Sequence, residues 1–193
     1  MLVSEIFSYD PDKPLIFSTP AFWLFFLLVM AVYSLIYRKP FIRNFYLLIV
    51  SLFFYYKSGG LFLFLLVLVT IVDYTTGLLI HHSRKKIFKR LFIFLSLLSN
   101  FGILAYFKYT GFFVNAINDL FGTGIQVHDY LASFSNLHLG TSFDINNIIL
   151  PVGISFFTFQ SLSYTIDVYR GKLHPVRNII DFGFYVSFFP QLV

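Results

Sequence analysis

The stretch that decides the fold lies near the C-terminal end of the chain and reads L-P-V-G-I-S-F-F-T-F-Q-S-L-S-Y-T-I-D-V-Y-R-G, from Leu150 to Gly171. It is long enough to cross a bilayer, because a spanning helix needs about 20 residues. Yet it contains Gln160 near its middle and Asp167 and Arg170 at its end. A polar group in hydrocarbon costs free energy unless it is paired. We therefore expect this stretch to face other helices or a cavity instead of lipid.

The composition is that of an integral membrane protein. Of the 193 residues, 58% are hydrophobic and 12% are charged, whereas soluble domains have about 45–50% and about 25%. The net charge is +5, but the basic residues lie in short segments between apolar runs, which favours a topology signal over a nucleic-acid partner. The chain has no cysteine, which excludes disulfides and thiolate chemistry. The expected partner is the lipid bilayer.

The apolar runs predict an all-α, polytopic transmembrane bundle of about five to six spans, within a single membrane domain that covers residues 1–193. The spans are expected at residues 20–37, 41–56, 61–80, 91–113 and 148–168, with a further one beginning at 179–193. The polar segment 114–147 is long for a connection, and part of it is compatible with a short interfacial helix.

Basic residues give this topology an orientation. The segments 38–43, 84–90 and 170–177 fall on the same side and hold eleven of the 14 Lys and Arg residues. Cytoplasmic segments of membrane proteins are enriched in Lys and Arg. The three segments are therefore predicted to be cytoplasmic, and the N-terminus and the segment 114–147 to be outside.

The 150–171 stretch also supplies the candidate site residues. Pro151 and Gly153 predict a helix start or break, since proline cannot donate a backbone hydrogen bond and glycine allows close approach. The small and polar residues that follow fit the wall of a hydrophilic or acyl-accepting channel, but such residues also serve helix packing in lipid, and their spacing leaves both readings open. The channel candidates are Ser155, Thr158, Gln160, Ser163 and Tyr164. Asp167 and Arg170 are three apart, so they share a helix face and are predicted to form a structural pair.

Asp73 is the single carboxylate well inside a predicted span. A buried carboxylate must be paired, hydrogen-bonded or protonated. The structural interpretation is a cap or a bond to another helix through neighbours such as Thr70, Tyr74 and Thr76. The alternative is a place on a proton or substrate pathway.

The five histidines lie outside the predicted spans. His81 and His82 are adjacent, so they point in different directions on a helix, and no carboxylate is near them in the sequence. We expect no metal site. The sequence also lacks the nucleophile-elbow, phosphate-loop, zinc-protease and dinucleotide-binding motifs.

Residues 150–171 closely resemble the signature of the membrane-bound O-acyltransferase family. The resemblance is strongest to the bacterial branch that contains the alginate O-acetyltransferase and the D-alanyl transfer protein of teichoic acid. Y-V-S-F-F-P-Q-L-V, residues 185–193, matches the same branch. Weaker upstream matches are R-N-F-Y-L-L-I-V-S-L-F-F-Y-Y at 43–56 and F-K-Y-T-G-F-F at 107–113.

The resemblance implies a multi-span helical enzyme of a bacterial plasma membrane. Such an enzyme moves an acyl group from acyl-CoA or an acyl carrier to a hydroxyl, in this branch of a cell-surface polysaccharide and with an extracytoplasmic partner protein. No bound cofactor is expected. The family's catalytic histidine lies in an apolar helix downstream of the motif, and no histidine of this chain takes that place.

By resemblance, the chain is therefore expected to be the N-terminal part of such an enzyme, with a truncated version of its fold. It would supply scaffold and part of the channel but no catalytic residue, with Gln160, Tyr164 and Asp167 lining or bracing the channel. Two alternatives remain open. One is a non-enzymatic transporter or export subunit for a lipid or glycan, which would use Asp73 and the broken fifth span. The other is an inactive fragment.

Overall fold

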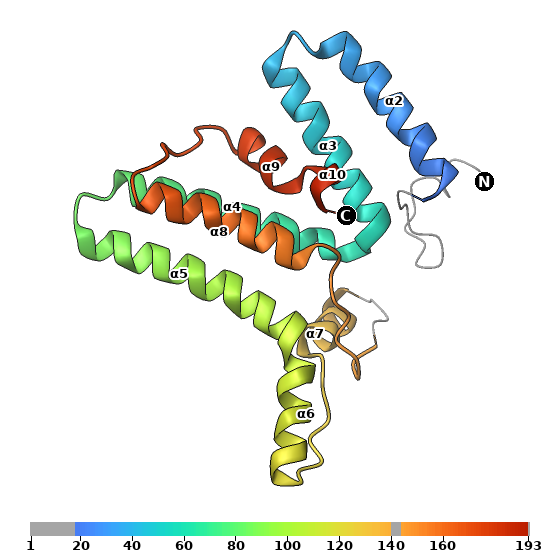
Figure 1. Cartoon of the computed structure of the whole chain (residues 1–193), viewed down its shortest axis with the longest axis vertical. Coiled ribbons are helices and arrows are strands. Elements are labelled where there is room, and N and C mark those ends of the chain that lie inside the picture. Colours follow the sequence, from blue (N-terminus) through green and yellow to red (C-terminus); the bar gives the residue numbers. More distant parts are fainter. Residues whose placement is uncertain (1–17, 140–143, 193) are drawn as a thin grey trace. The chain divides into compact units, whose positions relative to one another are not determined.

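The computed structural model describes residues 18–139 and 144–192 (Figure 1). Residues 1–17, 140–143 and 193 of the predicted domain lie outside these ranges. Every regular element within the described ranges is a helix, which confirms the all-α prediction. Two helical stretches, Pro40–His82 and Lys86–Phe121, are long and apolar enough to cross a membrane, and Pro20–Ile36 is a shorter apolar helix. The count of five to six spans stays a prediction.

The first helix begins where the sequence predicts, and the second begins one residue earlier than predicted. Helix α2 (Pro20–Ile36) starts at a proline, and the Thr19 side chain accepts a hydrogen bond from the Phe22 backbone N–H at 3.3 Å. Helix α3 (Pro40–Gly59) also starts at a proline, which suits a first-turn position. It has 20 residues, more than the predicted 41–56, and so reaches the length that a spanning helix needs.

A glycine bend separates α3 from the next long helix. A short 3₁₀ turn, η1 (Gly60–Phe62), leads into α4 (Leu63–His82). Gly60 has φ of +60°, a left-handed value that residues with a Cβ atom rarely adopt. The chain therefore bends between the predicted spans 41–56 and 61–80, and glycine is what permits the bend.

The fourth helix runs further than predicted. Helix α5 (Lys86–Leu104) continues through a π-helical turn, η2 (Ala105–Tyr109), into α6 (Thr110–Phe121). The prediction that a polar loop begins at residue 114 is wrong, because the helix ends only at Gly122, whose φ is +63°. A second helix of the predicted loop, α7 (Tyr130–Leu139), follows.

The last predicted span is interrupted. Helix α8 (Ile154–Tyr169) is followed by α9 (Ile179–Ser187) and by the four-residue α10 (Phe189–Leu192). A continuous helix over 179–193 is therefore wrong, and the break falls at Phe188, where ψ is 109°. Pro190 explains it, since proline has no N–H to continue the helical hydrogen bonds and its ring clashes with the preceding turn.

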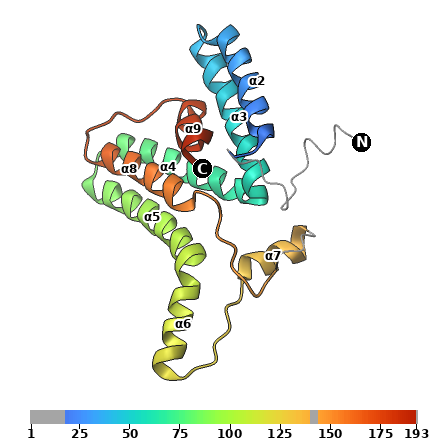
Figure 2. The same ribbon diagram turned by 45° about the vertical axis from the view of Figure 1, so that its right-hand side comes forward.

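The chain divides into two compact units, Met1–Asn100 with Val152–Val193 and Phe101–Pro151. In the first unit α4 and α8 lie side by side in both views (Figure 1 and Figure 2), while α9 packs on α3 and α4. Its fully buried side chains include Phe54, Tyr55, Leu66, Phe157 and Phe182. In the second unit the Tyr106 hydroxyl donates to Asp129 Oδ1 at 2.7 Å. The prediction of one membrane domain stays a prediction.

Candidate functional site

The helix that carries the candidate residues is fixed at its start. Gly153 lies in the left-handed region with φ of 70°, and the Phe157 N–H donates to its carbonyl at 3.0 Å. The buried Tyr55 hydroxyl of α3 donates to the Val152 carbonyl at 2.9 Å. The sequence around Pro151 and Gly153 thus starts α8 at Ile154, and Tyr55 anchors that start to α3.

Asp73 of α4 holds α8 along its length. This carboxylate is fully buried and accepts hydrogen bonds from Ser96 Oγ at 2.5 Å and from Ser161 Oγ at 2.5 Å. Asn100 Nδ2 donates to both carboxylate oxygens, at 3.0 and 2.9 Å. Asp73 therefore joins α4 to both α5 and α8.

The predicted bonding of Asp73 to other helices is present, but not through the neighbours that the sequence suggested. The Thr70 hydroxyl donates to the Leu66 carbonyl at 2.8 Å within α4. The Tyr74 hydroxyl donates to the Arg177 carbonyl at 2.9 Å. Hydroxyls close to a helical residue in sequence satisfy the backbone first, so the carboxylate takes its donors from α5 and α8.

Three of the five channel candidates line one open groove. Ser155, Gln160 and Ser163 of α8 border a groove of about 650 Å³ together with Tyr185 and Gln191 from α9 and α10. Phe156 and Phe159 supply its apolar walls. The groove therefore combines hydroxyls and amides with aromatic surface.

The Gln160 side chain is held in this groove by two hydrogen bonds. Its Nε2 donates to the Tyr185 carbonyl at 2.7 Å and to Gln191 Oε1 at 3.3 Å. Its own Oε1 is shielded from solvent and has no hydrogen-bond partner within the described residues. A buried carbonyl oxygen without a partner needs an explanation, and a substrate hydroxyl would satisfy it once the Gln160 amide turned toward the groove.

The other two candidates do not line this groove. The buried Thr158 hydroxyl donates to the Ile154 carbonyl of its own helix at 2.5 Å. The Tyr164 hydroxyl accepts from the Val176 N–H at 3.1 Å, and its ring centroid lies 4.5 Å from that of Phe182. Both side chains pack between helices, which is the packing alternative that the sequence left open.

The predicted pair of Asp167 and Arg170 is not formed in the part of the chain that the structure describes. Arg170 is the C-terminal cap residue of α8 and is exposed. The Asp167 backbone carbonyl accepts from the Lys172 N–H at 2.9 Å. An exposed ion pair contributes little free energy, so nothing holds the two side chains together where the helix ends.

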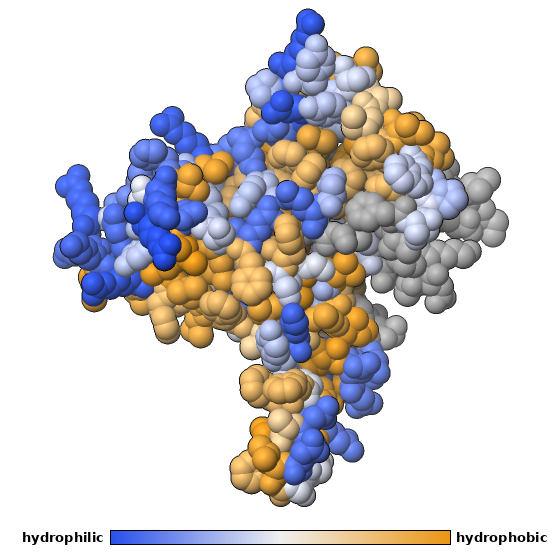
Figure 3. Space-filling view, in the orientation of Figure 1, coloured by the Kyte–Doolittle hydropathy of each residue, from blue (hydrophilic) through white to orange (hydrophobic). Residues whose placement is uncertain are grey.

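Three of the five histidines, His81, His82 and His174, lie together at one end of the first unit. The ring centroids of His81 and His174 lie 5.8 Å apart, and those of His81 and His82 lie 5.7 Å apart. Within the described residues no group of three or more His, Cys, Asp or Glu could hold a metal ion. These contacts bring together the basic segments 84–90 and 170–177, where hydrophilic residues gather on the surface (Figure 3).

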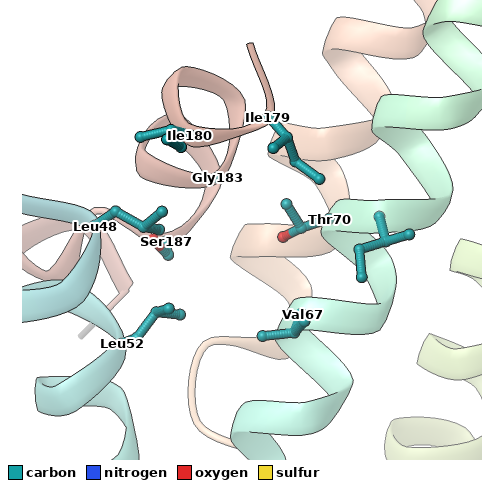
Figure 4. A pocket seen from close by; sticks show the side chains of 9 residues that line it. Leu48, Leu52, Val67, Thr70, Ile179, Ile180, Gly183 and Ser187 are labelled. Carbon is teal, nitrogen blue, oxygen red and sulfur yellow. The ribbon is translucent and has the colours of Figure 1, made fainter. Parts of the chain in front are cut away.

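A second, smaller pocket lies between α3, α4 and α9 (Figure 4). It has about 230 Å³ and is bordered mainly by aliphatic side chains such as Leu52, Val67 and Ile180. Its wall includes Ser187, whose buried hydroxyl has no partner among the described residues. The pocket fits a small apolar group, but it offers too few polar groups to orient a sugar hydroxyl.

Sequence reasoning missed the partners of these residues more than the residues themselves. Ser96 and Asn100 lie four apart on α5 and so present both donors on one face. Tyr185 and Gln191 complete the groove from a segment that was predicted as one continuous span. The four-residue spacing of Ser96 and Asn100 could have predicted a polar contact on that face of α5. Nothing in the sequence indicated that Asp73 would be the residue they contact.

Comparison with known proteins matches almost the whole chain to bacterial O-acetyl transfer proteins. "Probable alginate O-acetylase AlgI" of Pseudomonas aeruginosa is 36% identical over 183 residues, 93% of this chain and 32% of that protein. The same-named protein of Pseudomonas syringae is 36% identical over 182 residues. "Peptidoglycan O-acetyltransferase" of Helicobacter pylori is 30% identical over 210 residues, 93% of this chain and 36% of that protein.

The chain spans about a third of the length of these curated relatives. No family model matches the chain, and no solved structure matches it. The relatives are nevertheless all named for O-acetylation, and each aligns with 93% of this chain. Over the third of its relatives' length that it matches, the chain is similar to these O-acetylation proteins, in agreement with the resemblance of residues 150–171 and 185–193 to the membrane-bound O-acyltransferase family.

Proposed function

We propose that this chain is part of an enzyme that transfers an acetyl group to hydroxyls of a cell-surface polysaccharide. The observation that carries the proposal is its 30–36% identity, over 93% of its length, to proteins named for O-acetylation of alginate and of peptidoglycan. Both acceptors are glycans with exposed hydroxyls. Alginate-like acceptors are favoured, because most of these relatives carry the alginate name.

The open groove along α8 is the proposed wall of the acceptor path. Gln160 offers a carbonyl oxygen without a partner among the described residues, and Ser163 offers an exposed hydroxyl. A turn of the Gln160 amide would bring Oε1 into the groove, where a sugar hydroxyl donating to it would be held beside the aromatic wall. The base that takes its proton is proposed to be a histidine elsewhere in the whole enzyme, because a general base must reach the reacting hydroxyl.

The proposal extends to the acetyl donor and to the membrane in which the enzyme lies. The acetyl donor would be acetyl-CoA or an acetylated carrier on the cytoplasmic side, and a further protein outside the membrane would receive the acetyl group or the glycan. Convergence of the basic segments 84–90 and 170–177 at one end of the first unit supports a multi-pass arrangement with that end in the cytoplasm. The setting is a bacterial plasma membrane.

The test expresses the complete gene in a bacterium whose own polysaccharide O-acetylase has been deleted. We expect restored acetyl ester in the purified polysaccharide, and a fall of about fivefold or more with Gln160→Ala, since a lost hydrogen bond to a substrate is worth about 1 kcal/mol or more. Gln126→Ala, at an exposed position outside the groove, is the matched control. Wild-type acetylation by Gln160→Ala would remove the groove from the acceptor path, and no acetylation by the wild type at normal membrane abundance would contradict the function.

The transporter alternative has weaker support. It would route a substrate past Asp73, but this carboxylate is fully buried and bonded to three side chains. It borders none of the three described pockets. A structural role for Asp73 leaves that reading without a pathway in the described residues.

A further inference from the structure

A third groove, between α2, α3 and the segment from α9 to α10, has a different character from the acceptor groove. It has about 400 Å³. Phe26, Val29 and Tyr33 of α2 form one wall, and Arg43 and Leu47 of α3 form the other. Phe188 lies among the residues that close it from the α9 side. We propose that this groove binds an anionic phospholipid, with one acyl chain along its apolar walls and the phosphate at Arg43.

The groove is polar at one end and apolar at the other. Helices α2 and α3 form an antiparallel hairpin through residues 37–39 (Figure 1 and Figure 2), so Tyr33 and Arg43 lie near the turn while Phe26 lies farther from it. The seven-residue step from Phe26 to Tyr33 covers about 10 Å of helix. An apolar channel of this length with a cation at one end matches part of an acyl chain below a charged headgroup.

The charge of Arg43 is available to such a headgroup. Its Nε donates to Asn44 Oδ1 at 3.1 Å, and Asn44 Nδ2 donates to Asp181 Oδ1 at 2.8 Å. Asn44 thus stands between the cation and the nearby carboxylate. No ion pair occupies Arg43 in the part of the chain that the structure describes, so its terminal nitrogens can bind a phosphate in the forked geometry that guanidinium favours.

The neighbouring turn adds to the selectivity for an anion. Arg38 and Lys39 are exposed beside the polar end of the groove, and clusters of basic residues next to a membrane helix attract anionic lipids. A zwitterionic headgroup would bring its own cation toward these residues. The proposal therefore commits to a lipid with net negative charge, and not to a free phosphate, because the walls of the groove are apolar.

The first test measures lipid preference with the purified chain in mixed micelles. We expect phosphatidylglycerol to bind more tightly than phosphatidylcholine of the same acyl chains, by native mass spectrometry. Arg43→Gln should weaken phosphatidylglycerol about fivefold, the ratio that one basic residue at a membrane surface contributes, and leave phosphatidylcholine unchanged. Lys39→Gln is the matched control, because it removes the same charge from an exposed position that does not border the groove, and it should have the smaller effect.

A second pair of variants tests the groove itself. Met30 borders the groove and is partly exposed, whereas Leu35 of the same helix is 83% exposed and does not border it. Met30→Trp should fill the groove and abolish the preference for phosphatidylglycerol, and Leu35→Trp should keep it. Equal binding of both lipids by the wild type, or an unchanged preference in both Arg43→Gln and Met30→Trp, would overturn the proposal. So would a lipid-free dimer that Met30→Trp dissociates, because a second copy would then be the occupant.

Discussion

Removal of the Asp73 carboxylate is the sharpest test of how α8 is held in place. Asp73→Ala leaves the hydroxyls of Ser96 and Ser161 and the amide of Asn100 without their buried acceptor. All three of these side chains are fully buried, so water cannot replace the carboxylate at no cost. The substitution should therefore weaken the attachment of both α5 and α8 to α4.

The magnitude follows from the number of bonds. Interhelical hydrogen bonds in membrane proteins contribute about 0.6 kcal/mol each on average and about 1.7 at most. Three donors then give a loss of roughly 2 kcal/mol in the free energy of unfolding, with an upper value of about 5. The lower figure is expected, because serine hydroxyls in helices can turn to a backbone carbonyl and Asn100 Nδ2 already donates to the Ser96 carbonyl at 3.0 Å.

The assay is reversible unfolding in mixed micelles with a rising fraction of dodecyl sulfate, followed by circular dichroism. Asp73→Asn keeps one acceptor oxygen and should fall between Asp73→Ala and the wild type. Ser161→Ala removes a single bond and should cost about 0.6 kcal/mol. Ser163→Ala, an exposed serine on the same helix, is the control. An Asp73→Ala variant that unfolds with the wild type, or equal effects of Ser161→Ala and Ser163→Ala, would refute the reasoning.

Two further substitutions probe the packing around α8. Gly77→Ala would place a Cβ 3.0 Å from Cε1 of Tyr164. The cost of overpacking, about 1–3 kcal/mol, should outweigh the gain in helix propensity of about 1 kcal/mol, so the thermal unfolding midpoint should fall. Gly102→Ala is the control, because open space surrounds that position and the midpoint should not fall. Tyr55→Phe removes the bond to the Val152 carbonyl and should lower the free energy of unfolding by about 1 kcal/mol, and an unchanged midpoint would show that this bond does not anchor α8.

The helix starts could be predicted from the sequence because local chemistry sets them. Prolines stand at the first positions of α2 and α3, and the left-handed glycines Gly60 and Gly153 stand where the chain turns. Two predictions were wrong, the loop beginning at residue 114 and the continuous span over 179–193, and they had opposite causes. The helix beyond residue 114 continues because a segment with several polar side chains can still be helical, and the break before Pro190 was hidden by the strong hydropathy around it.

The partners of the candidate residues could not be predicted in the same way. Asp73 stood out because a lone carboxylate in an apolar run demands a partner. The amino-acid sequence does not indicate which helix supplies that partner, because Ser, Thr and Asn occur on several spans. The bond between Asp73 and Ser161 joins residues 88 apart, and a contact of that separation is decided by how the helices pack.

The polar residues of α8 lie on two faces of the helix, one buried against other helices and one bordering the open groove. Thr158, Ser161 and Thr165 follow one another at steps of three and four, so they share one face of the helix, and all three are fully buried. Gln160 faces the open groove instead. Adjacent residues are therefore expected to respond differently. Ser161→Ala removes a buried bond to Asp73 and should lower the free energy of unfolding. Gln160→Ala removes exposed bonds to Tyr185 and Gln191, so it should lower that free energy less and should reduce acetyl transfer. A loss of transfer by Gln160→Ala that only follows a loss of folded protein would mean that both faces of α8 are packing surfaces.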